Sequence, residues 1–255
     1  MQAEPYEALS ELYDDFMSDI PYDEWTGYIR EVLCENGIKD GLVCDLGCGS
    51  GIITEKLADL GYDMTGIDSS AEMLMRARER AEGKDILCLC QDITSFELYG
   101  TMRAFISTCD VINYVTDPKD LKKVFALVKN YLDPGGIFIF DIHTPYYYEN
   151  ICAGNTFSST DEDGAYIWEN DYDEKSRENR YCVTMFVRNH SSTDGTETYR
   201  RYEEEHIEKA HTVSDITEAA GSAGLRILSV TDGYTRNPLR PDSTRAVFTA
   251  VSQRT

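Results

Sequence analysis

The chain has 255 residues, of which 42% are hydrophobic, so it is long enough and apolar enough to fold around a packed core. Its longest apolar runs have the length of strands, far below the roughly 20 residues that span a bilayer, and we expect no signal peptide. Forty-six acidic residues against 24 basic ones give a formal charge of −22, which disfavours nucleic-acid partners because it repels phosphate. We therefore expect a cytoplasmic protein with neither a nucleic-acid nor a membrane partner.

The eight cysteines are spread along the chain without a CxxC pair. Several stand inside apolar strand patterns, where a reduced thiol behaves as a small hydrophobic side chain. The spacing therefore predicts reduced cysteines, as in a cytosolic protein, and neither disulfides nor a metal site.

The first 40 residues have a helical period. Apolar residues recur at helical spacing over residues 6–17, and a second amphipathic helix is expected from Asp23 to a stop at Gly37. Short apolar strands then alternate with helices, and Ser69 with Glu72 suggests a capping box. The expected strands are 42–44, 62–67, 86–90, 104–109 and 137–142, and the helices between them are 52–60, 69–80 and 117–131.

The alternation breaks after residue 145. Before this break, a turn is expected at 133–136. After it, three strands expected at 165–172, 181–188 and 196–206 indicate an antiparallel insertion. A helix at 213–223 and strands at 225–231 and 245–251 then return to the main sheet. The predicted fold is a doubly wound, mainly parallel, seven-stranded sheet: residues 1–145 and 210–255 form one domain, and 146–209 form a β-rich cap.

A glycine-rich loop connects the first strand of this sheet to the helix that follows. Gly47, Gly49 and Gly51 stand where a doubly wound sheet binds its ligand, and glycine lets the backbone approach that ligand closely. A dinucleotide fingerprint would have its third glycine at position 52, which is Ile52 here. Asp45 would also repel a diphosphate, whereas a carboxylate there suits the α-amino group of an amino-acid-like cofactor.

The loop and four later segments resemble one family in the same order and spacing. Residues 43–51 match the first signature of class I S-adenosylmethionine-dependent methyltransferases; residues 66–68, 91–93, 109–114 and 132–136 match the segments that follow. The resemblance covers residues 40–145 strongly and 210–255 in pattern only. It implies a Rossmann-like fold, S-adenosyl-L-methionine as cofactor and S-adenosyl-L-homocysteine as product.

The resemblance also implies roles for individual residues. Asp68 would bind both ribose hydroxyls, Asp92 the adenine amino group, and Ile93 would offer a backbone contact. Each acid also has a structural alternative, because Asp68 can cap the next helix and Asp92 a turn. Tyr13 would bond the methionine carboxylate or belong to a core stripe. The cofactor-binding residues that we expect are Tyr13, Trp25, Asp45, Gly47, Cys48, Gly49, Gly51, Asp68, Ser69, Met73, Gln91, Asp92, Ile93, Cys109 and Asn113.

Methyl transfer from a sulfonium needs an acceptor with a free lone pair, so a base is useful and a metal is not. His143 follows the fifth strand of the sheet and is our first candidate, although a loop histidine bonded to backbone would look the same. His206, near the end of the insertion, is the second candidate for the base, with a side chain that would point into the acceptor pocket.

The overall layout resembles small-molecule N-methyltransferases that act on amino sugars or glycine. It is still more similar to uncharacterised Firmicutes-type methyltransferases with a β-rich cap, which share the Tyr-Asp-x-x-Met start seen at residues 13–17. The chain lacks the Asn/Asp-Pro-Pro-Tyr motif of many enzymes that methylate nucleic acids or proteins. We therefore expect a small-molecule acceptor, methylated at N or O, and a monomer or homodimer. A non-catalytic S-adenosylmethionine-binding sensor or accessory protein and a dinucleotide oxidoreductase are the alternatives.

Overall fold

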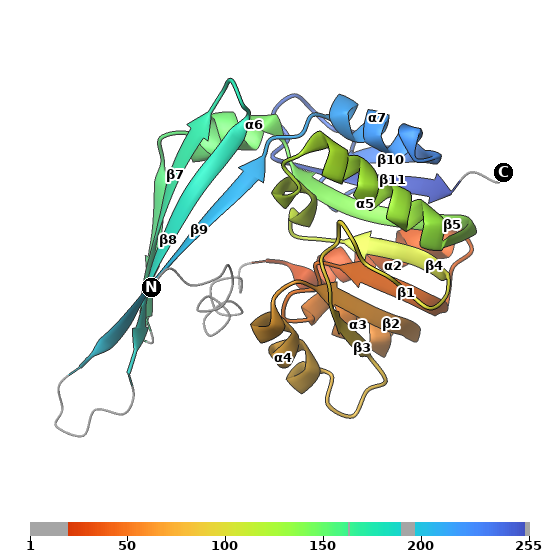
Figure 1. The fold of residues 1–255 in the computed structure, drawn as a ribbon, viewed down its shortest axis with the longest axis horizontal. Coiled ribbons are helices and arrows are strands. Elements are labelled where there is room, and N and C mark those ends of the chain that lie inside the picture. Colours follow the sequence, from red (N-terminus) through yellow and green to blue (C-terminus); the bar gives the residue numbers. More distant parts are fainter. Residues whose placement is uncertain (1–19, 163, 190–196, 253–255) are drawn as a thin grey trace.

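The computed structural model describes residues 20–162, 164–189 and 197–252. The helix expected over residues 6–17, and with it Tyr13, lies outside these ranges. A seven-stranded sheet in the order β10-β11-β5-β4-β1-β2-β3 forms the body of the molecule (Figure 1). Its parallel strands are β1 (Gly41–Leu46), β2 (Tyr62–Asp68), β3 (Leu87–Cys90), β4 (Met102–Ser107) and β5 (Leu132–His143).

Two further strands complete this sheet. β11 (Arg245–Ser252) runs antiparallel to both of its neighbours, β5 and β10 (Leu225–Asp232). Strand order 3-2-1-4-5 for the parallel part, with one strand inserted in reverse beside β5, confirms the predicted doubly wound, mainly parallel sheet. The carboxyl ends of β1, β2, β3, β4 and β5 consequently meet at one edge, where such sheets bind ligands.

Helices cover both faces because successive strand residues point to opposite sides. On one face, α2 (Tyr22–Glu35) and α3 (Ile52–Asp59) pack Leu33 and Leu57 against Ile139. On the other face, α5 (Pro118–Tyr131) and α7 (Val213–Ser222) pack against Phe138 and Phe140. Among the helices of the described ranges, none has the length and apolarity that crossing a membrane requires.

Two local expectations were wrong. Helix α4 (Ala71–Arg80) is capped by Ser70, whose hydroxyl accepts the Met73 N–H at 3.2 Å, and not by Ser69. Its start is shifted by one residue because the Asp68 carboxylate accepts the Ser70 N–H. Residues 133–136 belong to β5 and do not form a separate turn. The strand passes through an irregularity in its pairing with β4, where Gly135 has a φ of +83°.

The insertion forms a second, antiparallel sheet in the order β6-β7-β8-β9, beside the main sheet (Figure 1). Its strands are β6 (Thr156–Thr160), β7 (Gly164–Asp173), β8 (Glu178–Arg188) and β9 (Tyr199–Lys209). The chain enters it through α6 (Pro145–Tyr147) and a π-helix (Tyr148–Cys152). The sequence predicted three of these strands and missed β6, which is short, polar and mostly exposed. The division into two domains stays a prediction.

All eight cysteines are free thiols in the structure. Within the described ranges no cluster of His, Cys, Asp and Glu has the geometry of a metal site.

Candidate active site

A cavity of about 740 Å³ opens at the carboxyl edge of the main sheet and is closed on one side by β9 of the second sheet. It extends from the glycine loop and the end of β2, past the loops that follow β3 and β4, to the start of α5. The residues that line it are Gly47, Gly49, Asp68, Ser69, Ser70, Ala71, Glu72, Met73, Asp92, Ile93, Thr94, Cys109, Val111, Tyr114, Val115, Thr116, Asp117, Asp120, Glu205, His206 and Ile207.

The glycine loop presents its backbone to this cavity. The N–H groups of Gly47 and Cys48 donate to the Ile67 carbonyl at 2.8 and 3.0 Å, which ties the loop to β2. At Gly47, with a φ of +71°, a Cβ would lie 2.5 Å from Val111, so only glycine allows that side chain to cover the loop. Gly49 has a φ of +53° and open space where a Cβ would be, which leaves room for a ligand.

Two other loop residues from the expected set have structural roles. The Cys48 sulfur lies against Gly66, where a Cβ would be 2.8 Å away, and Cys48 does not line the cavity. A Cβ on Gly51 would meet Ala77 of α4 at 3.0 Å, so Gly51 lets α4 approach the loop. These two residues shape the site from behind.

Asp68, at the end of β2, lines the cavity and organises its neighbours. Its Oδ2 accepts the Gly49 N–H and its Oδ1 accepts the Ser70 N–H, both at 2.9 Å. Burial raises the pKa of Asp68, and these backbone hydrogen bonds oppose the rise. Since a carboxylate has about four lone-pair sites, Asp68 still has two acceptor positions to offer a ligand.

Asp45, at the end of β1, is buried behind the loop. Its Oδ2 accepts the Thr54 hydroxyl at 2.6 Å, while its Oδ1 has no hydrogen-bond partner among the described residues. Burial raises the pKa of Asp45 to about 7; the Thr54 hydrogen bond opposes this rise and the charge of Asp68 adds to it. Asp45 is 1% exposed and does not itself line the cavity. A buried acceptor without a donor is costly, so its Oδ1 is suited to a cationic donor.

The loop after β3 carries two of the expected residues, and one of them lines the cavity while the other does not. Asp92 lines the cavity, and its Oδ1 accepts both the N–H and the hydroxyl of Thr94 at 2.7 Å, so it also caps a turn. Gln91 does not line the cavity. Its Oε1 accepts the Glu97 N–H at 2.7 Å and its Nε2 lies 3.3 Å from the Glu97 carbonyl, so Gln91 braces the loop.

The loop after β4 is strained where it reaches the cavity. Cys109 and Asp110 have φ values of +60° and +54°, a left-handed backbone conformation that residues other than glycine adopt at a cost in free energy. The Asp141 carboxylate accepts both of their N–H groups, at 3.3 Å from Cys109 and 2.7 Å from Asp110. Asp141 on β5 therefore helps to hold the conformation that presents Cys109 to the cavity.

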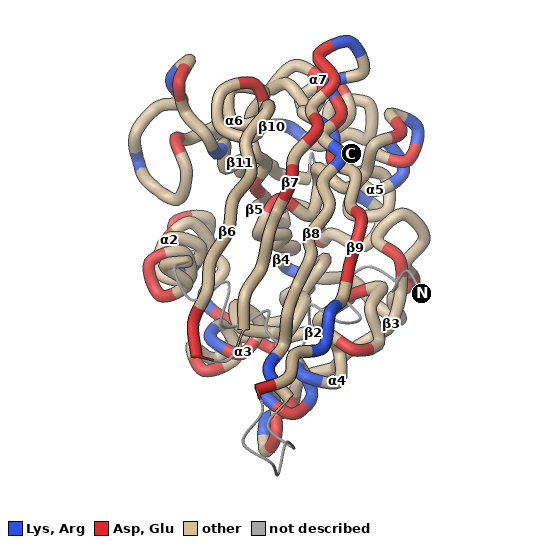
Figure 2. The backbone as a smooth tube through the Cα atoms, turned by 90° about the vertical axis from the view of Figure 1, so that its left-hand side faces the viewer, with Lys and Arg blue, Asp and Glu red and all other residues tan. Residues whose placement is uncertain are grey.

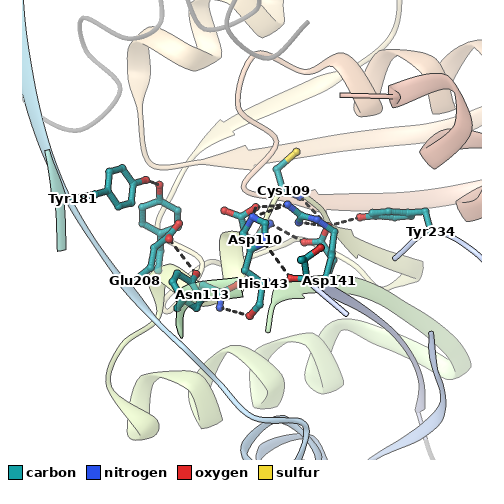
Figure 3. Close-up of polar contacts among 12 residues, drawn as sticks. Cys109, Asp110, Asn113, Asp141, His143, Tyr181, Glu208 and Tyr234 are labelled. Atoms are coloured by element: carbon teal, nitrogen blue, oxygen red, sulfur yellow. Dashed lines mark hydrogen bonds and ion pairs between the residues drawn. The ribbon is translucent and has the colours of Figure 1, made fainter. Parts of the chain in front are cut away.

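An arginine whose side chain is 16% exposed connects this loop to β11, between Asp110 and Asp141, which Figure 3 labels. Arg245 donates from Nη1 to Asp141 Oδ2 at 2.7 Å and from Nη2 to Asp110 Oδ1 at 2.9 Å. Tyr234 donates to the same Asp141 oxygen at 2.8 Å. Burial alone would raise the pKa of Asp110, but His143 and Arg245 hold it well below its usual range.

Trp25 belongs to this buried group and not to the cavity. Its ring stacks on Tyr234 with the centroids 4.3 Å apart, and the Arg245 guanidinium lies 5.1 Å from its centre. Trp25 is absent from the cavity lining. The direct contact of Trp25 with the cofactor stays a prediction.

His143 is also outside the cavity lining. Its Nε2 lies 2.8 Å from Arg245 Nη2, and its Nδ1 lies 3.3 Å from the Thr244 carbonyl. The same Nε2 lies 3.2 Å from Asp110 Oδ1, so Arg245 and Asp110 both contact this nitrogen. Tyr147 stacks flat on the ring at 3.7 Å. Both ring nitrogens therefore contact protein groups outside the cavity lining, and the role of His143 as the base stays a prediction.

Asn113 is buried and connects three segments. Its Nδ2 donates to the carbonyls of His143 and Lys209 at 3.1 and 2.8 Å, and its Oδ1 accepts the His143 N–H at 3.0 Å. It does not line the cavity. Asn113 therefore fixes the end of β9 against β5, and the cofactor contact expected for it stays a prediction.

His206, the second candidate for the base, lies on β9 in the wall of the cavity. Its Nε2 is 3.3 Å from Glu204 Oε2, and its Nδ1 is 3.5 Å from the Tyr114 hydroxyl. The Tyr114 hydroxyl is also hydrogen-bonded to the Tyr181 hydroxyl. Sequence reasoning missed Glu204 and Tyr181, although alternation along β9 places Glu204 on the same face as His206.

Comparison with known proteins gives consistent results. Residues 43–136 match the family described as "Methyltransferase domain". The chain is 33% identical, over 98% of both chains, to a Bacillus subtilis (strain 168) protein named "Putative methyltransferase YqeM". An S-adenosylmethionine-dependent methyltransferase from Clostridium acetobutylicum ATCC 824 superposes with a TM-score of 0.87 at 30% identity, covering 98% of this chain and 99% of that one. The sugar N-methyltransferase KedS8 from Streptoalloteichus sp. ATCC 53650 shares the fold, with a TM-score of 0.77 at 16% identity and coverage of 96% and 92%.

Proposed function

Since the chain belongs to the class I S-adenosylmethionine-dependent methyltransferases, we propose that it methylates a small-molecule acceptor, at nitrogen or oxygen, by in-line displacement. The methyl donor of this family is S-adenosyl-L-methionine and the product is S-adenosyl-L-homocysteine. When bound, the donor supplies an activated methyl group on a positively charged sulfur. What the protein adds is alignment of the acceptor with that group and exclusion of water.

The observation that carries the donor assignment is the pair of carboxylates around the glycine loop. The unpartnered Oδ1 of Asp45 fits an ammonium group, and the free acceptor positions of Asp68 fit two hydroxyl groups of a ribose. The open space above Gly49 lets a ligand pass between them. An amino acid joined to a nucleoside has this combination of groups, whereas a dinucleotide would bring its anionic diphosphate, and no ammonium group, to the loop beside Asp45.

The remaining donor contacts follow from the residues that line the cavity. We assign Asp92 to the adenine amino group, Ile93 to a backbone contact, and Ser69 and Met73 to the wall beside the nucleoside. Cys109, on the strained loop, would lie beside the methionine portion. Cys48, Gly51, Gln91 and Asn113 act through the residues that they hold in place.

A small acceptor is supported by the walls of the cavity. β9 closes the side that faces away from the glycine loop, so the acceptor must fit between this strand and the loop after β4. The charge of −22 opposes a nucleic-acid acceptor. The sensor alternative has no comparable support, because the proteins with which the chain shares at least 30% identity are named as methyltransferases. Cytoplasmic location and oligomeric state remain predictions.

Calorimetric titration with S-adenosylmethionine tests the donor, and release of S-adenosylhomocysteine on addition of small amines and alcohols tests the reaction. We expect saturable binding to the wild-type protein and no binding of NAD. Failure of S-adenosylmethionine to bind would refute the proposed function. Binding without turnover on any acceptor would favour the sensor.

A further inference from the structure

The inference concerns the acceptor and rests on the proposed function. We propose that the acceptor is an amine that enters as an ammonium ion, and that Tyr114 takes its proton while passing its own to His206, which Glu204 supports. Two independent features lead to this, the charge of the cavity lining and the chain of contacts behind Tyr114.

The described part of the cavity lining contains acidic residues and neither lysine nor arginine. Such a lining attracts a cation and repels carboxylate, phosphate or phenolate acceptors. Asp68 and Asp92 lie at the donor end. Asp117, Asp120 and Glu205 lie at the opposite end, next to Tyr114 and β9. β9 starts with basic residues and turns acidic where it reaches the cavity (Figure 2). The acids are Asp68, Glu72, Asp92, Asp117, Asp120 and Glu205.

Glu204 and His206 form a buried pair at this end. The side chain of Glu204 is 0% exposed and that of His206 is 1% exposed, with Oε2 and Nε2 3.3 Å apart. A buried carboxylate is costly unless it is paired, and pairing with histidine stabilises the imidazolium form. If Nε2–H faces Glu204, the Nδ1 lone pair faces the Tyr114 hydroxyl at 3.5 Å.

Tyr114 and His206 both line the cavity, but Tyr114 is partly exposed whereas the His206 side chain is 1% exposed, so Tyr114 is the residue that can touch an acceptor. Tyr181 fixes the geometry by bonding the Tyr114 hydroxyl and by stacking on His206 with the ring centroids 4.7 Å apart. Burial, with the charges of Tyr181, Glu208 and Asp110, raises the pKa of Tyr114 well above its usual range. Tyr114 therefore gives up its proton only as it receives another.

The proposed step is balanced. The acceptor ammonium gives a proton to the Tyr114 oxygen as the Tyr114 proton moves to His206 Nδ1, leaving a neutral amine and an imidazolium beside Glu204. The amine nitrogen then attacks the donor methyl carbon. The new C–N bond forms as the C–S bond breaks, and sulfur keeps the electron pair. After the methylated ammonium leaves, the imidazolium loses its proton to solvent by the same path.

The contrast with His143 sharpens this assignment. His143 ends β5 and His206 lies within β9, but His143 Nε2 contacts Arg245 and Asp110 outside the cavity lining, whereas a hydroxyl that lines the cavity faces His206 Nδ1. A tyrosine hydroxyl can donate and then accept, which a guanidinium cannot do. Only the second arrangement can carry a proton away from the cavity.

The charge preference is tested on protein saturated with S-adenosylhomocysteine, using benzylamine, benzyl alcohol and benzoate as probes of similar shape. Calorimetry should show benzylamine binding at least tenfold more tightly than the other two, with at least fivefold loss in Glu205→Gln. Benzylamine binding no tighter than benzyl alcohol or benzoate, or undetected, overturns the proposal. Saturation with S-adenosylhomocysteine in the same experiment shows that the donor site is intact, so this failure differs from failure of the proposed function.

The proton path is tested by methyl transfer to benzylamine at high enzyme concentration between pH 7 and 9.5. Tyr114→Phe and His206→Asn should lower kcat at least 30-fold at pH 7.5, with KM changed less than threefold. The deficit should shrink toward pH 9.5, as the amine deprotonates in water. Tyr199→Phe, at an exposed position of β9, is the matched control and should retain wild-type kcat. A wild-type kcat in Tyr114→Phe, a deficit that does not change with pH, or wild-type binding of benzylamine without methyl transfer overturns the path.

Discussion

Asp141 Oδ1 accepts the backbone N–H of Asp110 at 2.7 Å, so a carboxylate on β5 supports a left-handed residue in the loop after β4. Arg245 binds the carboxylates of both Asp110 and Asp141, so the repulsion between these two acids does not open the loop. The strained conformation beside the cavity thus depends on a buried ion network formed by residues far apart in the sequence (Figure 3).

Replacement of Arg245 is expected to be strongly destabilising. Arg245→Met leaves the buried Asp141 and its neighbour Asp110 without their cation, and breaking such a network costs about 3–5 kcal/mol. Urea denaturation measures the free energy of unfolding. The control is Arg236→Met, which removes ion pairs of a half-exposed arginine and should cost less than about 1 kcal/mol. Equal losses in the two variants would contradict the assigned role of Arg245.

Asp68→Ala should weaken S-adenosylmethionine binding at least tenfold. It removes two acceptor positions for the ribose and the acceptor that orients the Gly49 N–H, and hydrogen bonds to a charged group contribute about 1.5–3 kcal/mol each. Calorimetry gives the dissociation constant. Asp63→Ala, at an exposed position on the same strand, is the control and should bind normally. Unchanged affinity in folded Asp68→Ala would remove the ribose assignment.

Asp45→Asn should stabilise the cofactor-free protein while weakening cofactor binding. The pKa of Asp45 is about 7 in the folded protein against 3.8 in the unfolded chain, so its contribution to stability is lost as pH rises from about 4 to 7. Asparagine carries no charge to bury, so the Tm advantage of the variant should grow over this range.

The same substitution removes the anionic partner of the cofactor ammonium group. Wild-type affinity for S-adenosylmethionine should therefore fall as pH drops below 7, and the variant should lack this dependence. Thermal denaturation at pH 5 and 8, with and without the cofactor, measures both effects. A variant less stable than wild type at pH 8 would argue against a destabilising buried charge at Asp45.

His211→Gln should make the protein less sensitive to mild acid. Burial lowers the pKa of His211 from 6.5 to about 4, partly offset by its hydrogen bond to the Val115 carbonyl at 3.0 Å. The unfolded chain therefore binds a proton first, and stability falls by about 1–2 kcal/mol between pH 6.5 and 5. Glutamine keeps a donor without this titration. Urea denaturation at both pH values should show a smaller loss for the variant, and an equal loss would exclude His211 as the source.

Much of the fold was predictable because its signals are local. Alternating strand and helix periods predicted the seven-stranded sheet and the antiparallel insertion, which the structure confirms. The exceptions are also local in cause. β6 has no alternating apolar face to detect, and the start of α4 is set by the Asp68 side chain, which no helical period reveals.

By itself, the sequence determined the family and the edge of the sheet where the donor is expected. Parallel strands bring their carboxyl ends together, so residues that follow consecutive strands, such as Asp45, Asp68 and Asp92, meet without further information. Only the tertiary structure decided what His143 and His206 can do. His143 ends β5 and His206 lies within β9, but their ring nitrogens contact Arg245 and Tyr114, 102 and 92 residues away. Whether a lone pair is occupied depends on such distant packing partners, and no local pattern encodes it.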